Sequence, residues 1–259
     1  MNVAIAQMPM AWALDENTRT ILDWLGRARE QGADVAVFPE CAVSGYHYRM
    51  CEGLSAQRVD GALAQIGARC AELGIAAVVG ALTFASPEQR RPSNAVAVFE
   101  RDGSLAGMFP KIRLTTGAEG SLFEPGAAGS RRCFLLGGVR CAVLICCELV
   151  DAPSGTLVEN WRGILAGLDE TPELVFLPGV MDLRDKAPGA PRQCAIAMAS
   201  EVGCHVVVAN WPAWLQSGGP PMGRSFAVSP AGEILCEAPA GEPALVTATP
   251  ALPWTGCAA

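Results

Sequence analysis

Three residues suited to nucleophilic catalysis each follow an apolar stretch of the chain. They are Cys146 after Val143-Leu144-Ile145, Glu40 after Val37-Phe38-Pro39, and Lys111 after Met108-Phe109-Pro110. A thiolate attacks carbonyl carbons, a carboxylate can take and return the thiol proton, and an ammonium group lowers the thiol pKa and opposes negative charge on the attacked oxygen. Taken singly, each residue is more often structural or solvent-facing. Together they predict a thiol-dependent active site.

The apolar patterning predicts strands that alternate with helices early and late, with hairpins between them. Strands are expected at residues 3–6, 34–38, 75–82, 94–100, 104–109, 133–136, 141–145, 174–177, 205–209 and 244–247, with two more around 229–232. Helices are expected from about residue 15 to a stop at Gly32, and at 59–73, 158–164 and 192–202, whereas 115–131 has the composition of a loop. These connections predict an α/β fold with a mixed sheet, and residues at the strand ends would converge on one edge of it.

The size and composition of the chain favour a globular protein with a small-molecule substrate. With 259 residues, of which 51% are hydrophobic and 17% charged, the chain suits a single domain over residues 1–259. The net charge of −7, without a Lys/Arg cluster, argues against nucleic acid or an anionic membrane as a partner. The spacing of its two histidines and 11 cysteines fits no zinc site.

The N-terminus lacks the basic region and the long apolar run of a signal peptide, and no later run approaches membrane-spanning length. An odd number of cysteines without a secretion signal indicates reduced thiols. We therefore expect a cytoplasmic protein.

The motifs around the three residues resemble those of the nitrilase superfamily, the carbon–nitrogen hydrolases, whose catalytic Glu, Lys and Cys occur in this chain order. The similar segments are Phe38-Pro39-Glu40 with Ser44-Gly45-Tyr46, Lys111-Ile-Arg-Leu114 with Glu119 and Phe123-Glu-Pro-Gly126, and Leu144-Ile-Cys-Cys-Glu148. Further similar segments near the ends of the chain are Val3-Ala-Ile-Ala-Gln7, Val207-Val-Ala-Asn210 and Gly223-Arg-Ser225. The ordered set covers nearly the whole chain, which makes the resemblance specific.

This resemblance implies a four-layer αββα sandwich that forms a homodimer or a higher homo-oligomer. It implies that Cys146 is the nucleophile and Glu40 the general base, and that Lys111 and the backbone N–H of Cys147 stabilise the oxyanion. Glu119 would position the substrate or assist proton transfer. The implied reaction is hydrolysis of a non-peptide C–N bond, in an amide or an N-carbamoyl compound, through a thioester and without a metal or cofactor.

The residues around the nucleophile depart from the family pattern. Cys147 stands where the family usually has an aromatic residue, and Leu149-Val-Asp-Ala-Pro153 replaces the usual continuation after Glu148. The particular substrate is therefore not transferable from the resemblance. Side chains expected to line the substrate pocket are Tyr46, His47, Tyr48, Glu148 and Trp211, with Trp211 and Trp214 about as suited to packing.

Three other readings remain open from the sequence. A degenerate binding or scaffold protein would keep the fold and lose turnover, although retention of all four site residues argues against it. Nitrile hydrolysis or acyl transfer could use the same thiol. A Cys–His pair is a third hypothesis, for which His47 is a better candidate than His205, because His205 begins an apolar strand.

Overall fold

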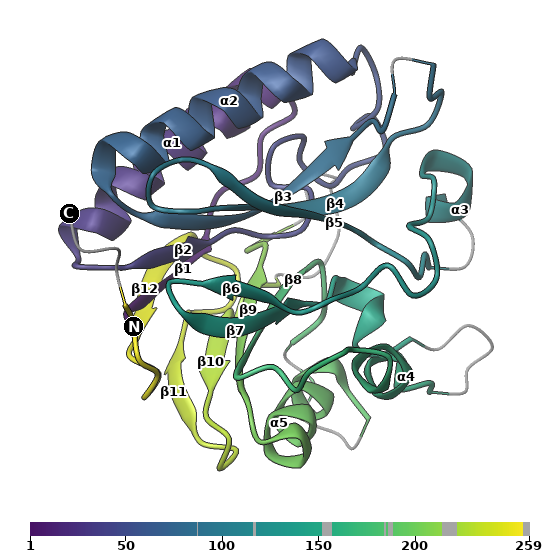
Figure 1. Ribbon diagram of the computed structural model, residues 1–259. Helices are drawn as coiled ribbons and strands as arrows, with labels where there is room; N and C mark the ends of the chain where they lie inside the picture. The colour runs from purple at the N-terminus through teal and green to yellow at the C-terminus, as the bar shows by residue number, and fades with distance from the viewer. Residues whose placement is uncertain are drawn as a thin grey trace.

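The computed structural model of the chain describes residues 1–86, 88–115, 118–151, 157–183, 185, 189–213 and 222–255. These residues form four layers, in which two β-sheets pack face to face and helices cover the outer face of each sheet (Figure 1). The fold is therefore a four-layer αββα sandwich of the α/β class, as the motif resemblance implies.

The first sheet is built from the N-terminal half of the chain and one late strand. Its strands are β1 (Val3–Gln7), β2 (Val35–Val37), β3 (Ala76–Thr83), β4 (Ser93–Phe99), β5 (Leu105–Pro110) and β12 (Ala244–Ala248). In the order β12-β1-β2-β3-β4-β5, the strands β1, β2 and β3 run parallel, and the remaining pairs are antiparallel. Because β5 is separated from β3 by two antiparallel steps, β2 and β5 end at the same edge of the sheet.

The second sheet has the same kind of mixed topology. Its strands are β6 (Phe134–Leu136), β7 (Val139–Val143), β8 (Leu174–Gly179), β9 (His205–Asn210), β10 (Phe226–Val228) and β11 (Ile234–Glu237). In the order β11-β10-β9-β8-β7-β6, the three strands β7, β8 and β9 are parallel, with antiparallel neighbours on both sides. Both sheets are thus mixed, in agreement with the pattern of hairpins and helices in the sequence.

The strands are apolar on both faces because each sheet lies between two other layers. Successive side chains of a strand point to opposite faces, so Val3 and Ile5 pack between the sheets while Ala4 packs under the helices. In the second sheet, Val207 faces the first sheet and Val208 faces the outer helices. The result is one apolar core between the sheets and one further core beneath each helical layer.

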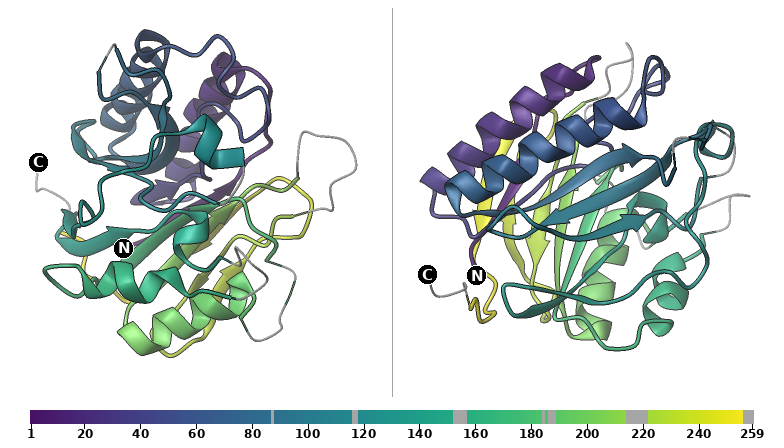
Figure 2. Two further views of the ribbon diagram at one scale, coloured as in Figure 1. Left: turned by 90° about the vertical axis from the view of Figure 1, so that its right-hand side faces the viewer. Right: turned by 45° about the horizontal axis from the view of Figure 1, so that its top comes forward.

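The helices form the outer layers. The helices are α1 (Leu14–Glu30) and α2 (Ala56–Leu73) on the first sheet, α4 (Asn160–Ala166) and α5 (Pro191–Val202) on the second, and α3 (Ala118–Leu122) beyond the end of β5. Helices α1 and α2 lie side by side (Figure 2). Ser55 caps the start of α2 by accepting a hydrogen bond from the Arg58 N–H, and Gly74 ends it with φ +62°. No helix in the described part of the chain is long and apolar enough to span a membrane.

A few local expectations differ from the structure. Strand β7 ends at Val143, two residues earlier than expected, because residues 146–148 turn into a 3-10 helix. Helix α3 lies in the segment 115–131, whose composition indicated a loop, because five residues are too few to show helical periodicity. Helix α4 begins at Asn160, and Val158 instead forms an isolated bridge with Asp151. Trp214 lies outside the described residues.

Candidate active site

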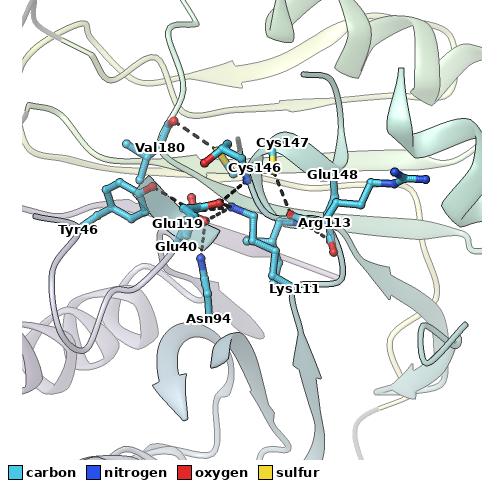
Figure 3. A network of polar contacts seen from close by, with 12 residues as sticks. Glu40, Tyr46, Asn94, Lys111, Arg113, Glu119, Cys146, Cys147, Glu148 and Val180 are labelled. Carbon is cyan, nitrogen blue, oxygen red and sulfur yellow. Dashed lines mark hydrogen bonds and ion pairs between the residues drawn. The ribbon is translucent and has the colours of Figure 1, made fainter. Parts of the chain in front are cut away.

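Glu40, Lys111 and Cys146 lie at strand ends that come from both sheets. Glu40 follows β2 and Lys111 follows β5 in the first sheet, whereas Cys146 follows β7 in the second. Their side chains lie close together where the two sheets meet (Figure 3). The site therefore depends on the packing of one sheet against the other.

The ammonium group of Lys111 is at the centre of the site. Its side chain is fully buried, and Nζ lies 2.7 Å from Glu40 Oε1 and 2.8 Å from Glu119 Oε1. Burial alone would lower the pKa of Lys111, but the negative charges around it, that of Glu40 first, raise the pKa well above 10.5. Lys111 therefore carries a positive charge at any pH near neutrality.

The two carboxylate oxygens of Glu40 differ in their hydrogen bonding. Oε1 accepts hydrogen bonds from Lys111 Nζ and from Asn94 Nδ2, both at 2.7 Å, while Oε2 is buried and has no hydrogen-bond partner among the described residues. Complete burial raises the pKa of Glu40 above 4.5, and the charge of Glu119 adds to this, against the opposing effect of Lys111. Such a carboxylate is suited to accept a proton, because one oxygen is oriented and the other is available.

Glu119 is placed by α3 and is the second carboxylate bound to the Lys111 ammonium. Its carboxylate also accepts hydrogen bonds from the Tyr46 hydroxyl at 3.0 Å and the Thr115 N–H at 2.7 Å. Burial would raise the pKa of Glu119, but the attraction of Lys111 and these hydrogen bonds hold it below 4.5. Glu119 is therefore an anion, and it shares the Lys111 charge with Glu40.

Cys146 lies at the start of a sharp turn. Its backbone has φ +49°, in the left-handed region that side chains with a Cβ rarely adopt, and the residue as a whole is half-buried. The thiol donates a weak hydrogen bond to the Val180 carbonyl at 3.4 Å. Burial and the charge of Glu40 raise the thiol pKa well above 9.0 despite the opposing effect of Lys111. The resting group is thus a neutral thiol, which must lose its proton to a base before it attacks.

The residues beside Cys146 can stabilise an oxyanion. Cys147 and Glu148 continue from Cys146 as a 3-10 helix, and the first N–H groups of such a turn have no acceptor within it. The Cys147 side chain is directed elsewhere, because its Sγ donates to the Arg113 carbonyl at 3.1 Å. A backbone N–H and the nearby ammonium would together meet negative charge on a carbonyl oxygen attacked by Cys146.

Two residues hold the backbone of Glu40 from opposite sheets. Trp211, which follows β9 and is fully buried, donates its indole N–H to the Glu40 carbonyl at 2.9 Å. Gly80 in β3 passes so close that an added Cβ would lie 2.2 Å from the Pro39 carbonyl oxygen and 2.4 Å from the Cys41 nitrogen. Trp211, for which the sequence left pocket lining and packing both open, thus supports the turn that carries Glu40.

The other predicted pocket residues lie in different surroundings. Tyr46 contacts Glu119, whereas Tyr48 is 67% exposed and packs edge-on against Trp12. His47 is buried in its own loop, where Nδ1 accepts from the Arg49 N–H and Nε2 lies 3.2 Å from the Ser44 carbonyl. Burial lowers the pKa of His47, so its ring is neutral near neutral pH. Both ring nitrogens have partners within the loop.

Glu148 is fully buried. In the view of Figure 3 it lies on one side of Lys111, and Tyr46 lies on the other. Its carboxylate binds Arg131 and two backbone N–H groups, so it is part of the support of the site.

Sequence reasoning assigned no role to Asn94, Gly80 or Arg131. Asn94 stands beside Ser93 at the polar start of an otherwise apolar strand. Gly80 offered a glycine inside a strand, which often marks a close approach of another backbone. Arg131 gave no local signal, because its partner Glu148 is recognisable only in the folded chain.

Among the described residues, no group of three or more His, Cys, Asp and Glu side chains is arranged to hold a metal ion. The charged groups of the site instead neutralise one another through Lys111, Glu40 and Glu119.

The αββα fold brings a thiol, two carboxylates and an ammonium group together at one site. The family model for carbon–nitrogen hydrolases matches residues 2–150, which include Glu40, Lys111, Glu119 and Cys146. The chain belongs to the carbon–nitrogen hydrolase family, within the nitrilase superfamily, and is an amidase-like enzyme.

Solved structures of an amidase from Nesterenkonia sp. AN1 have the same fold. One, of the amidase after removal of its His-tag, has a TM-score of 0.80 at 26% identity and covers 98% of this chain and 93% of that chain. Another, of a variant with the acetamide moiety of fluoroacetamide added covalently at its active-site cysteine, has a TM-score of 0.79 at 25% identity and covers 96% and 89%. No curated protein sequence matches the chain significantly.

Proposed function

We propose that the enzyme hydrolyses the C–N bond of a small amide or N-carbamoyl compound through a thioester on Cys146. The observation that carries this proposal is the buried Lys111 ammonium bound to both Glu40 and Glu119, at 2.7 and 2.8 Å, close to the Cys146 side chain (Figure 3). A buried cation between two carboxylates is costly to form, and this arrangement supplies a base and an oxyanion-stabilising charge at one point.

In the acylation step, Cys146 Sγ attacks the carbonyl carbon while Glu40 accepts the thiol proton. The carbonyl π electrons move to the oxygen, where Lys111 and the Cys147 N–H stabilise the negative charge. The intermediate collapses when the C–N bond breaks and Glu40 returns the proton to the leaving nitrogen. Ammonia or an amine leaves, and the acyl group remains bound to sulfur.

In the deacylation step, water attacks the thioester carbon and gives a proton to Glu40. The same charges stabilise the second oxyanion, and the C–S bond breaks as Glu40 returns that proton to sulfur. The products are a carboxylic or carbamic acid and the free thiol. Glu119 would orient the substrate nitrogen, because its carboxylate lies beside Lys111 and accepts hydrogen bonds.

The amide class of substrate is supported by the similar amidase, whose active-site cysteine takes up the acetamide moiety of fluoroacetamide. We extend this to the present chain because the family and the fold are shared. We further propose that the enzyme acts in the cytoplasm. We also propose that it forms a homodimer or higher oligomer, and light scattering on the purified protein would test this oligomeric state.

The test is ammonia release from a panel of small amides, ω-amides and N-carbamoyl compounds. Wild-type enzyme is expected to release ammonia from at least one class, Cys146→Ala from none, and mass spectrometry should detect an acyl adduct on Cys146. Turnover that persists unchanged in Cys146→Ala would contradict the proposal. An enzyme silent on the panel whose Cys146 reacts with fluoroacetamide no faster than its other thiols would favour the scaffold reading.

A further inference from the structure

We propose that Glu148 is a positioning residue that sets the placement of Lys111 relative to Cys146. This inference rests on the proposed function, in which Lys111 and Cys146 act on one substrate. It assigns Glu148 to the support of both groups, in place of the pocket lining predicted from the sequence.

The carboxylate of Glu148 binds the backbone next to each of the two groups. Oε1 accepts a hydrogen bond from the N–H of Ile112, the residue after Lys111, at 2.6 Å. Oε2 accepts one from the N–H of Ile145, the residue before Cys146, at 2.8 Å. One rigid, planar group therefore joins the two segments.

Arg131 fixes the orientation of that carboxylate. Its Nη2 lies 2.7 Å from Glu148 Oε1, 2.8 Å from Oε2 and 3.1 Å from the carbonyl of Pro110, the residue before Lys111. Both side chains are nearly inaccessible to solvent, with exposed fractions of 3% for Arg131 and 0% for Glu148. The backbone on both sides of Lys111 is thus bound to this buried ion pair.

The two joined segments belong to different sheets, which gives the contact its importance. Ile112 follows β5 of the first sheet, and Ile145 follows β7 of the second. Apolar packing between sheets fixes their separation but tolerates small shifts, because it is not directional. Directional hydrogen bonds to Glu148 fix the relative position of the Lys111 ammonium and the Cys146 thiol.

An amide at position 148 would not replace the carboxylate. Both oxygens of Glu148 face N–H donors, so a glutamine would direct its NH₂ group at one of those donors. The Arg131 charge would also remain buried without its partner. Glu148→Gln should therefore separate the two segments while it preserves the size of the side chain.

The experiment compares Glu148→Gln with the double variant Glu148→Leu/Arg131→Met in the amidase assay. The double variant removes both buried charges, so no unpaired charge remains, while the Ile112 and Ile145 N–H groups lose their common acceptor. We expect kcat to fall about 100-fold in both variants with KM changed less than about threefold, because misplacement of the reacting groups affects chemistry more than binding. Thermal unfolding verifies that the double variant is folded.

A second ion pair provides the matched control. Arg192 and Glu237 lie 2.8 Å apart and join α5 to β11, away from the segments that follow β5 and β7. Glu237 also binds the partly exposed Arg224 at 2.7 Å. Arg192→Met/Glu237→Leu should change the unfolding temperature without a loss of kcat. If kcat falls in both double variants in proportion to their loss of unfolding temperature, the positioning role of Glu148 is overturned.

The outcomes also separate this inference from the proposed function. Turnover in Cys146→Ala would refute the proposed function itself. If Cys146→Ala is inactive but the folded double variant retains wild-type kcat, the thioester mechanism stands and the role of Glu148 is refuted.

Discussion

The indole N–H of Trp211 donates a 2.9 Å hydrogen bond to the backbone carbonyl of Glu40, across 171 positions of the sequence. Trp211 follows a strand of the second sheet, and Glu40 follows a strand of the first. The main chain of Glu40, the proposed base, is therefore anchored to the sheet that carries Cys146, the proposed nucleophile.

Trp211→Phe should destabilise the enzyme because the buried Glu40 carbonyl loses this donor. The expected cost is about 1–3 kcal/mol in the free energy of unfolding, measured by urea denaturation. Trp161→Phe is the control, because the Trp161 indole N–H is also buried but has no partner among the described residues. Equal costs for both substitutions would show that only packing volume matters at position 211.

Gly80→Ala should impair both folding and turnover. The new methyl group would overlap the Pro39 carbonyl and the Cys41 nitrogen, so the turn that carries Glu40 must move. We expect a loss of about 1–3 kcal/mol in unfolding free energy and a reduced kcat. Gly61→Ala, in an exposed part of α2 with open space around its Cα, should instead stabilise by about 0.5–1 kcal/mol. Normal kcat in Gly80→Ala would contradict the close fit.

The pH dependence of kcat/KM should have an acid limb set by Glu40. Burial raises the pKa of Glu40 above 4.5, and the base must be ionised, so activity should fall as the pH drops through that raised value. Asn94→Leu removes a donor that favours the ionised form, which raises the pKa further and shifts the limb to higher pH. A limb that stays in place in Asn94→Leu would indicate that another group titrates.

Substitution of the adjacent cysteines should separate their roles. Cys146→Ala is expected to lower kcat/KM by about 10⁴-fold or more, because it removes the nucleophile. Cys147→Ala should retain activity within about tenfold, since its proposed contribution is a backbone N–H and its thiol donates to Arg113. Cys147 is buried whereas Cys146 is half-buried, so of these two adjacent thiols mass mapping should find the faster alkylation at Cys146. Loss of activity in both variants would contradict this division.

The α/β class with mixed strand directions and the positions of Glu40, Lys111 and Cys146 at strand ends follow from local features of the sequence, whereas the four-layer arrangement was implied by the motif resemblance. The three residues were expected at one edge of a single sheet, but Cys146 comes from the second sheet. Apolar runs that end in a polar residue mark strand ends, and parallel strands bring such ends to one edge. The alternation of hairpins and helices likewise indicated mixed sheets. Each of these features depends on a few neighbouring residues, which is why it can be predicted from the sequence.

The surroundings of the site depend on contacts that the sequence does not display. Trp211 was expected near the pocket as a loop aromatic, and Glu148 as a residue just after the nucleophile motif. In the structure their polar atoms bind main-chain groups of distant segments. His47 and Tyr48 follow Glu40 by a few residues, but the loop turns them toward Trp12. Local order along the chain does not specify the direction in which a loop side chain points.

The pairing of β1 with β12 has a consequence for the synthesis of the enzyme. Strand β1 can join β2 early, but its other edge is covered only by β12, and the Gln7 side chain donates to the Pro239 carbonyl, 232 residues later. A nascent chain on the ribosome therefore exposes an unpaired apolar edge until β12 has emerged. A truncated protein that ends before β12 would be prone to aggregate, and chaperones would be expected to hold the growing chain during this interval.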